Sequence, residues 1–442
     1  MGHSYRSDPR GLAQGVAELL GADWADRQPR VREWPMLRLA GVWRFGVLGE
    51  QAALARRFQA ACAGVARLAP GAGNQRRTPS YQGFVKALRR HREALTTGLP
   101  AALRERLPRL AGPAWQAGPW VPLAVDGTRI DAPRSRSCQE AFGEGSRKGS
   151  APQLELTAIW HLGVHAWHDY CIGAGHASER TLLRQMLDRL PERAMLLADA
   201  GFIGYDLCRD LHQRGVKFLW RVGANVRLLS ELGTHAPAGK NLVWRWPQDR
   251  RDQPPLLLRL IRVGRGRKQQ WLVTNVLDPC ELPKRMAAGL YRQRWGIECA
   301  YRSLKQTFSR AKLRSQAADL AQLELAGSVL GHWLLARLSL RARGPTLGPR
   351  DWSPARSAEA LRSLLTDGGG SRGWRADLRA AFANPPANPG NGLARNGSER
   401  KPRGRRAPRG SAPRRPRNSR PEQLLWRMPS RRVHGVECHP PF

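Results

Sequence analysis

Two short apolar runs in this 442-residue chain are each followed directly by an aspartate. Residues 121–125 (Val-Pro-Leu-Ala-Val) lead into Asp126, and residues 194–198 (Ala-Met-Leu-Leu-Ala) lead into Asp199. Continuous apolar runs of this length are typical of strands that are buried on both faces of a sheet. Segments with helical spacing lie between and around them, so the sequence predicts a mixed α/β core whose strands deliver carboxylates at their ends.

Taken singly, each aspartate also has a purely structural interpretation. Asp126 precedes a glycine, which is common in tight turns, and Asp199-Ala-Gly is a common entry to a helix. A carboxylate at the end of a strand can instead hold a divalent cation, because ligands of α/β sheets bind at that edge. Further carboxylates are needed to favour the second interpretation.

A predicted helix that begins near Pro283 presents a third carboxylate together with a phenol and two cations. These side chains belong to Tyr291, Arg294, Glu298 and Lys305. At about 100° per residue they fall within an arc of roughly 60°, on one face of the helix. Such a face suits phosphate chemistry, since a carboxylate can hold a metal while Arg, Lys and Tyr grip phosphate oxygens. A solvated surface would give the same pattern.

The three carboxylates are far apart in the chain, and only the fold could bring them together. Asp126 and Asp199 are 73 residues apart, and Glu298 follows Asp199 by 99 residues. Two strand ends and a cation-bearing helix form a more specific set than any one of them. The set is typical of metal-dependent phosphoryl transfer.

The rest of the chain divides into regions of different composition. Residues 1–112 are predicted to be helical, with a basic segment around Lys86, Arg89, Arg90 and Arg92 that could bind DNA or simply be a solvated face. The other predicted regions are an α/β core at 113–345, a β-rich insertion within it at 223–282, C-terminal helices at 346–384, and a disordered Arg/Pro-rich tail at 385–442.

Several elements within these regions are predicted from local patterns. Ser80 is expected to cap a helix that continues to about residue 107, and further helices are expected at 178–190 and 317–341. In the insertion, strands are expected at 242–246, 255–263 and 269–275.

The charge balance indicates a polyanionic partner. With 74 Lys and Arg against 35 Asp and Glu, the formal net charge is +39 and the isoelectric point is about 11.5. Nucleic acid is the first candidate and a membrane surface the second, although no stretch is long and apolar enough to span a bilayer. The first residues lack a signal-peptide core and the seven cysteines are scattered, so we expect a cytoplasmic, nucleoid-associated protein with reduced thiols.

The pattern Tyr-x₂-Arg-x₃-Glu-x₆-Lys, with Asp-Gly-Thr at 126–128 and Asp-x-Gly-Phe at 199–202 upstream, resembles the bacterial DDE transposases of the insertion-sequence-four type. The resemblance runs from Asp126 to Lys305. It implies a ribonuclease-H-like mixed-sheet core in which Asp126, Asp199 and Glu298 form the catalytic triad. It also implies that Tyr291, Arg294 and Lys305 hold DNA near the cleaved end.

The chemistry implied by the resemblance uses two Mg²⁺ or Mn²⁺ ions held by the triad. These ions would activate first water and then a DNA 3′-hydroxyl for in-line attack on phosphodiesters. Members of this family excise their element through a hairpin intermediate and unstack a base near its end. Trp295 and Trp271 are candidate stacking surfaces, because a flipped base gains stacking energy on an aromatic face. Both could equally be core tryptophans.

The expected partners are the terminal inverted repeats, bound through residues 1–112, and target DNA, with two subunits pairing the ends in a synaptic complex. Two features depart from the family pattern: Ala200 stands where many relatives carry a charged residue, and the basic tail is not explained. The alternatives are a ribonuclease-H-like nuclease that cleaves without joining, and a decayed or repurposed DNA-binding protein. Retention of all three carboxylates argues against the last.

Overall fold

In a computed structural model of the chain, the described residues are 22–28, 36–46, 53–68, 80–143, 149–223, 235–239, 241–245, 252–266, 269–343 and 353–367. All of them lie within one compact unit, Met1–Ala387. The basic tail predicted at 385–442 lies outside the described residues. Within them, no helix is long and apolar enough to cross a membrane.

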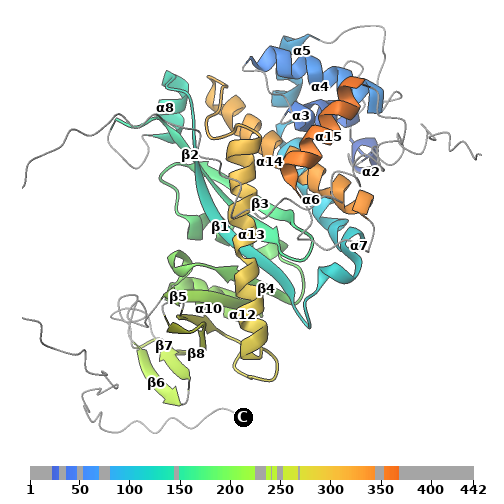
Figure 1. Cartoon of the computed structure of the whole chain (residues 1–442). Helices are drawn as coiled ribbons and strands as arrows, with labels where there is room; N and C mark the ends of the chain where they lie inside the picture. The colour runs from blue at the N-terminus through green and yellow to red at the C-terminus, as the bar shows by residue number, and fades with distance from the viewer. Residues whose placement is uncertain are drawn as a thin grey trace, which may run out of the picture. The chain divides into compact units, whose positions relative to one another are not determined.

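A single mixed sheet organises the described part of the chain (Figure 1). Its strands are β1 (Val121–Asp131), β2 (Gln153–His161), β3 (Ala166–Ala174), β4 (Ala194–Ala198), β5 (Lys217–Gly223), β6 (His235–Gly239), β7 (Leu242–Arg245), β8 (Leu256–Val263) and β9 (Gln270–Thr274). The nine strands lie in the order β3-β2-β1-β4-β5-β9-β8-β7-β6. β1 is antiparallel to β2 and parallel to β4, which is itself parallel to β5. The predicted mixed α/β class is confirmed.

The register of β1 against β4 places Asp126 and Asp199 side by side. Asp199 follows the end of β4 as predicted, but the prediction that Asp126 ends its strand is wrong, because β1 continues to Asp131 in its pairing with β2. Ala124 pairs with Leu197 in the parallel ladder, and Asp126 and Asp199 each follow two residues later. Because side chains alternate along a strand, Asp126 projects to the same face of the sheet as Ala124, and Asp199 to the same face as Leu197. Ala124 and Leu197 belong to the apolar cluster that also contains residues of α13 (Trp295–Arg302), so both aspartates are directed to the side of the sheet that α13 covers.

The predicted β-rich insertion continues the same sheet. Its last strand, β9, pairs antiparallel with β5 between Leu219 and Thr274, and β8 and β7 follow outward. β5 thus pairs with β4 on one side and with β9 of the insertion on the other. Without the insertion, β5 would be an unpaired edge strand. Strands predicted around residues 242–246, 255–263 and 269–275 are all present.

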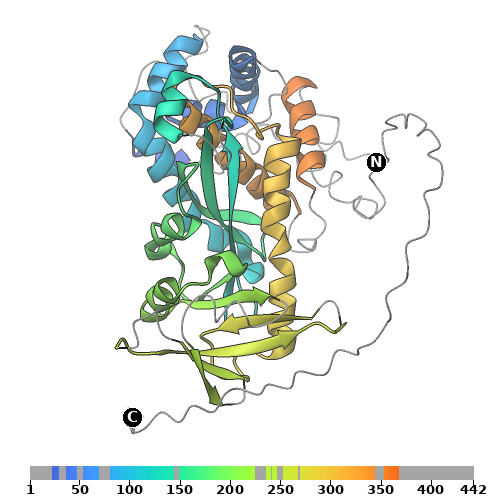
Figure 2. The ribbon, with the colours of Figure 1, turned by 90° about the vertical axis from the view of Figure 1, so that its left-hand side faces the viewer.

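The helix that carries the Tyr-Arg-Glu-Lys pattern runs beside the sheet as one rod (Figure 2), but it is not one regular α-helix. α12 (Lys284–Gln293) ends at Arg294, α13 follows, and residues 303–307 form a π-helical turn, η7 (Ser303–Thr307). A π turn adds a residue per hydrogen-bonded ring. Lys305 therefore departs from the α-helical phase, and the prediction of a single 60° arc is wrong at its last member.

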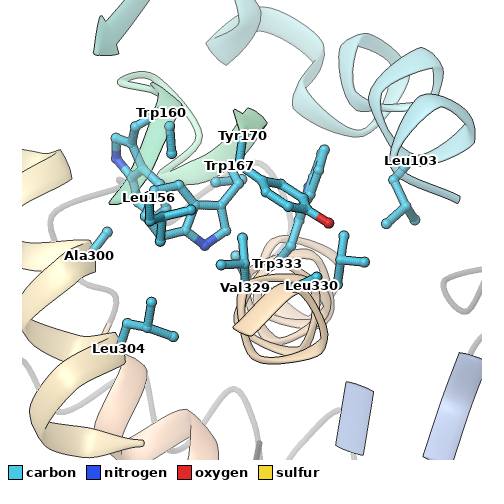
Figure 3. Packing of buried hydrophobic residues seen from close by; sticks show 14 of the residues in the cluster. Leu103, Leu156, Trp160, Trp167, Tyr170, Ala300, Leu304, Val329, Leu330 and Trp333 are labelled. Atoms are coloured by element: carbon cyan, nitrogen blue, oxygen red, sulfur yellow. The ribbon is translucent and has the colours of Figure 1, made fainter. Parts of the chain in front are cut away.

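The sheet face that α13 covers also receives α14 (Ala318–Arg343), which was predicted at 317–341. Figure 3 shows Trp160 and Trp167 of the sheet packed with Val329, Leu330 and Trp333 of this helix. Trp167 Nε1 also donates a hydrogen bond to His332 Nδ1 at 2.9 Å. The helix is thus fixed to the sheet by buried aromatic contacts.

The N-terminal helices pack on the far side of α14 and share its core. They are α2 (Ala22–Asp26), α3 (Met36–Phe45), α4 (Leu54–Leu68), α5 (Tyr81–Arg90), α6 (Leu99–Glu105) and α7 (Leu107–Ala111). Trp43 Nε1 donates to the carbonyl of Leu323, 2.9 Å away. Ser80 caps α5 as predicted, accepting a hydrogen bond from the Gly83 amide at 3.0 Å. The helix expected to continue to residue 107 is interrupted by a π turn, η2 (Ala94–Gly98).

The remaining helical elements are divided between the two apolar clusters: the buried residues of the two that cover 136–142 and 354–367 belong to the cluster that contains α13, and those within 179–213 belong to the other. They are η3 (Gly112–Trp115), α8 (Arg136–Phe142), α9 (Glu179–Arg184), η4 (Leu187–Arg189), η5 (Ala200–Phe202), α10 (Tyr205–Gln213) and α15 (Pro354–Asp367). Leu183 of α9 and Leu207 of α10 lie in the apolar cluster on the face opposite α13. The helix predicted at 178–190 is shorter, because α9 ends at Arg184 and only a 3₁₀ turn follows.

Candidate active site

Asp126 and Asp199 each accept a hydrogen bond from a neighbouring backbone amide, and both face the candidate site. Asp126 Oδ1 accepts a hydrogen bond from the Gly127 amide at 3.0 Å. Asp199 Oδ1 accepts one from the Gly201 amide at 2.8 Å and caps η5. The structural interpretation of Asp199 as a helix entry is therefore correct, and it leaves Oδ2 of each carboxylate for other partners.

Arg294 lies between two of the three predicted catalytic carboxylates. Its guanidinium is 3.9 Å from Asp126 Oδ2 and forms an ion pair with Glu298 one turn further along the helix. The three side chains are 11%, 21% and 28% exposed for Arg294, Asp126 and Glu298. The fold thus gathers Asp126 and Glu298, which are far apart in sequence, around one cation.

Asp199 belongs to the same electrostatic neighbourhood. Burial raises the pKa of the Asp126 carboxyl to about 7; Arg294 opposes this, while Asp199 and Glu179 raise it further. A carboxylate whose charge is destabilised by desolvation and by like charges is poised to bind a cation. The three predicted carboxylates therefore lie near one another, with Asp126 in the middle of β1, Asp199 directly after β4 and Glu298 on α13.

Sequence reasoning missed two further glutamates beside Gly127, which lie on the face of the sheet opposite the Asp126 side chain. A Cβ at Gly127 would lie only 2.4 Å from Glu179 Oε1 and 2.6 Å from Glu155 Oε1, so both carboxylates crowd the backbone next to Asp126. Glu155 stands in an otherwise apolar strand, Gln-Leu-Glu-Leu-Thr-Ala-Ile-Trp, which was a usable signal. Glu179 follows Ser178 and resembles an ordinary acidic first turn of a helix, so nothing in the sequence distinguished it.

The other members of the Tyr-Arg-Glu-Lys pattern are less accessible than an open phosphate-binding face requires. Tyr291 is 7% exposed, and the Arg294 guanidinium carbon lies 5.8 Å from the centre of its ring. Lys305 is half-buried; burial lowers the pKa of its ammonium group, and Asp131 and Glu155 act in the opposite direction. Tyr291 is thus brought beside Arg294, whereas the charged neighbours of Lys305 are Asp131 and Glu155 and not the predicted triad.

The two candidate stacking tryptophans differ in exposure. Trp295, directly after Arg294, is 52% exposed, and the Arg302 guanidinium lies 5.6 Å from its ring centre. The alternative that Trp295 is a core residue is therefore wrong. Trp271 in β9 is half-buried and packs against the apolar cluster on the other face of the sheet.

The donor set fits a hard divalent cation in its chemistry, since every candidate ligand atom is a carboxylate oxygen. The side chains are not already arranged around one ion: within the described ranges, no group of three or more His, Cys, Asp or Glu has that arrangement. Arg294 explains part of this, because its guanidinium occupies the space between Asp126 and Glu298.

The basic segment of α5 is partly engaged inside the protein. Arg89 Nε is 2.6 Å from Asp319 Oδ2, and Arg92 is hydrogen-bonded to Gln322, both on α14. Two of the four predicted DNA-binding cations thus hold α5 against α14. Lys86 and Arg90 of the same segment are exposed.

Comparison with known proteins places these residues in a recognised domain. Residues 121–334 match the family described as "Transposase DDE domain". The chain is 28% identical over 280 residues to the transposase InsG for insertion sequence element IS4 of Escherichia coli (strain K12). That alignment covers 59% of this chain and 62% of the relative, so the chain spans about three fifths of the relative's length. A cryo-EM structure of the piggyBac transposase synaptic complex with hairpin DNA aligns with a TM-score of 0.39 and 10% identity, over 87% of this chain and 84% of that one.

Proposed function

The chain carries a DDE transposase domain of the kind found in insertion-sequence-four-like elements, and from this premise we propose that it is a DNA transposase that cuts the ends of its own insertion sequence and joins them to target DNA. The observation that carries the proposal is that Asp126, Asp199 and Glu298 lie near one another where β1 and β4 meet α13. Arg294 contacts two of them, and Asp199 lies beside the first in the parallel register. We further propose that β1 to β5 form the ribonuclease-H-like unit.

In the proposed mechanism the triad carboxylates bind two Mg²⁺ or Mn²⁺ ions, which when bound would activate the attacking oxygen and stabilise the leaving oxygen of the phosphodiester. The carboxylates act as ligands, and their ionised form is the one required. Arg294 balances the charge of Asp126 and Glu298 in the metal-free protein, and on DNA binding its guanidinium would turn to a phosphate, for which it is well suited.

Trp295 is the exposed aromatic surface closest in sequence to Arg294, and we propose that it stacks on a base unstacked near the cleaved end, as hairpin formation requires. Base stacking on an aromatic face is worth about 1–3 kcal/mol, so Trp295→Ala should slow hairpin formation on end DNA about 10-fold. Folding should be unaffected, because half of the ring is already in solvent. The matched control is Leu277→Ala, which removes another exposed large apolar side chain. Equal hairpin yields from the two variants would contradict the role given to Trp295.

We propose that two subunits pair the two element ends. The Lys and Arg side chains of this strongly basic chain would contact the DNA phosphates. A field of this sign gives salt-dependent, sequence-independent affinity in addition to specific binding. The measurement is the mass of the complex with end DNA by light scattering. A mass of one protein per end at saturation would contradict pairing.

The decisive experiment follows cleavage of a labelled duplex that carries the element's own end, in Mg²⁺, by the wild type and by Glu298→Gln. The wild type should nick at the boundary of the inverted repeat, and the variant should bind the end without cutting. Glu281→Gln is the matched control, because Glu281 is an exposed carboxylate just before α12 and outside the site.

The alternatives give different results in the same assay. Cleavage without strand transfer into a supercoiled target would identify a nuclease that does not join. Binding without cleavage by the wild type and both variants would favour a decayed or repurposed DNA-binding protein. Equal cutting by the wild type and Glu298→Gln would overturn the assignment of the triad.

A further inference from the structure

A cavity away from the three predicted catalytic carboxylates lies between the N-terminal helices and the edge of the sheet. Residues of η2 and α6 line one side of it, the edge strand β3 and η4 line another, and α14 lines a third. Its volume of about 480 Å³ falls within the range of about 300–1,000 Å³ that is typical of sites for small molecules. None of Asp126, Asp199 and Glu298 belongs to its lining.

The lining of this cavity carries more positive than negative charge. It contains three arginines, Arg92, Arg104 and Arg189, and one carboxylate, that of Asp169. Arg92 and Arg189 are exposed, so the cavity opens to solvent on the side where these cations lie. The lining therefore holds two positive charges that Asp169 does not balance.

The three guanidinium groups are already held in place. Asp169 Oδ1 is 3.1 Å from Arg104 Nη1, and Asp169 Oδ2 accepts a hydrogen bond from Arg189 Nε at 2.6 Å. Arg92 donates a hydrogen bond to the side chain of Gln322 on α14. Each guanidinium has five N–H donors, so these bonds leave donors for a ligand. Cations that are fixed before a ligand arrives also reduce the entropy cost of binding it.

Two further observations favour an anion in this cavity. Burial lowers the pKa of the Arg104 guanidinium; Asp169 opposes this, and the like charge of Arg189 lowers it further. Tyr170, another lining residue, is 9% exposed, and its hydroxyl has no hydrogen-bond partner within the described ranges. A buried hydroxyl without an acceptor is costly, and a ligand oxygen is one way to satisfy it.

We propose that this cavity binds a phosphate monoester that carries a small apolar body, such as a nucleoside monophosphate. A phosphate monoester has about 1.5 to 2 negative charges at neutral pH, which matches the two unbalanced cations. Guanidinium groups also pair with phosphate in a bidentate geometry. The apolar part of the lining would contact the body of the ligand, and it consists of Pro100, Ala101, Ile172, Leu323 and Ala326. The inference does not rest on the proposed function.

The test is a calorimetric titration of the full chain with adenosine monophosphate. Arg92→Gln removes one cation and leaves the ion pairs of Asp169 intact, so it should weaken binding about 10-fold. Ala101→Trp fills the cavity from an exposed position on α6 without changing the charge, and it should abolish binding. Arg184→Gln is the matched control and should bind as the wild type does, because Arg184 also pairs with a carboxylate, Asp210, but lies outside the cavity.

The positive charge of the whole chain is the competing explanation for any binding of phosphate. A chain with a formal net charge of +39 attracts anions over much of its surface. Equal affinities for the wild type, Arg92→Gln and Ala101→Trp would show such general attraction and overturn the proposal. Equal binding of adenosine, which has no phosphate, would also overturn it. Should Ala101→Trp fail to fold, Arg92→Gln and its control Arg184→Gln decide the outcome.

Competition against bound adenosine monophosphate identifies the source of the phosphate. Displacement by a single strand with a 5′-phosphate, but not by the same strand with a 5′-hydroxyl, would identify a DNA end as the ligand. Displacement by inorganic phosphate and by neither strand would identify a free nucleotide. Displacement by both strands alike would show that backbone phosphodiesters are recognised, and would overturn the assignment of a monoester. These measurements require no DNA cleavage, so their outcome is independent of the transposase assay.

Discussion

Arginine–carboxylate pairs occur at the carboxylate site, formed by Asp126, Asp199 and Glu298, and at the contact between α5 and α14. The two regions differ in charge balance. At the helix contact, Arg89 meets Asp319 one to one, and the hydrogen bond from Arg89 lowers the pKa of that carboxyl. At the carboxylate site, Arg294 is shared between Asp126 and Glu298, and burial raises the pKa of the Asp126 carboxyl. The helix contact is electrically balanced, whereas the site around Arg294 has more carboxylates than cations.

The largest expected effect is on DNA cleavage, and only substitutions at the carboxylate site should produce it. Asp126→Asn should reduce cleavage of end DNA by about three orders of magnitude, because the loss of a metal ligand removes several kcal/mol of charge stabilisation in the transition state. Asp319→Asn should change the rate less than about twofold, since that carboxylate only pairs with Arg89. Comparable losses in single-turnover rates would erase the distinction between the two regions.

Removal of the shared cation should be the next largest effect. Arg294→Met leaves Asp126 and Glu298 facing each other without compensation, so the metal-free protein should lose on the order of 2 kcal/mol of stability. Mg²⁺ should restore much of the loss, because the ion can take the place of the guanidinium. Denaturant unfolding with and without Mg²⁺ measures both effects. Arg292→Met, on the exposed side of α12, is the control, and an equal loss there would mean that Arg294 has no special role.

The pH dependence of stability should have opposite signs in the two regions. The folded-state pKa of Asp126 is about 7, above its ordinary value of 3.8, so its contribution to stability is fully present below about pH 4 and is lost as the pH rises through 7. The folded-state pKa of Asp319 is lowered, so its contribution is present near neutral pH and is lost as the pH falls through the lowered value.

The measurement is the free energy of unfolding without metal between pH 3 and 8, and the value for each variant is subtracted from that of the wild type. Asp126→Asn should gain stability relative to the wild type as the pH rises from 5 to 8, by an amount on the order of 3 kcal/mol or less. Asp319→Asn should show no such gain. A flat difference curve for Asp126→Asn would remove the electrostatic basis of the comparison.

The smallest effect is expected for the exposed pair at the helix contact. A double-mutant cycle of Arg89→Ala and Asp319→Ala should give a coupling energy of about 0.2–1 kcal/mol, which high salt reduces. The exposed pair Arg136 and Glu140 on α8 offers a reference of the same kind. A coupling energy well above this range would show that the α5–α14 contact is stronger than surface pairs generally are.

Much of the core was predictable from sequence because local patterns determined it. The apolar runs before Asp126 and Asp199 correctly predicted two strands, although the first continues past Asp126 to Asp131. The spacing from 317 to 341 predicted α14 within two residues. Ser80 was found as a helix cap from its side chain alone. Burial, periodicity and capping depend on neighbours in the chain, and a sequence displays those directly.

What the sequence by itself determined is the identity of the candidate carboxylates, the helix beside them and a strongly basic chain suited to DNA. Only the tertiary structure decided that Arg294 stands between Asp126 and Glu298, and that Lys305 leaves the helical phase in a π turn. It alone revealed Glu155 and Glu179 at Gly127. The physical reason is that these relations depend on strand register and on burial between segments many residues apart, and no local pattern in the chain encodes a distance across the fold.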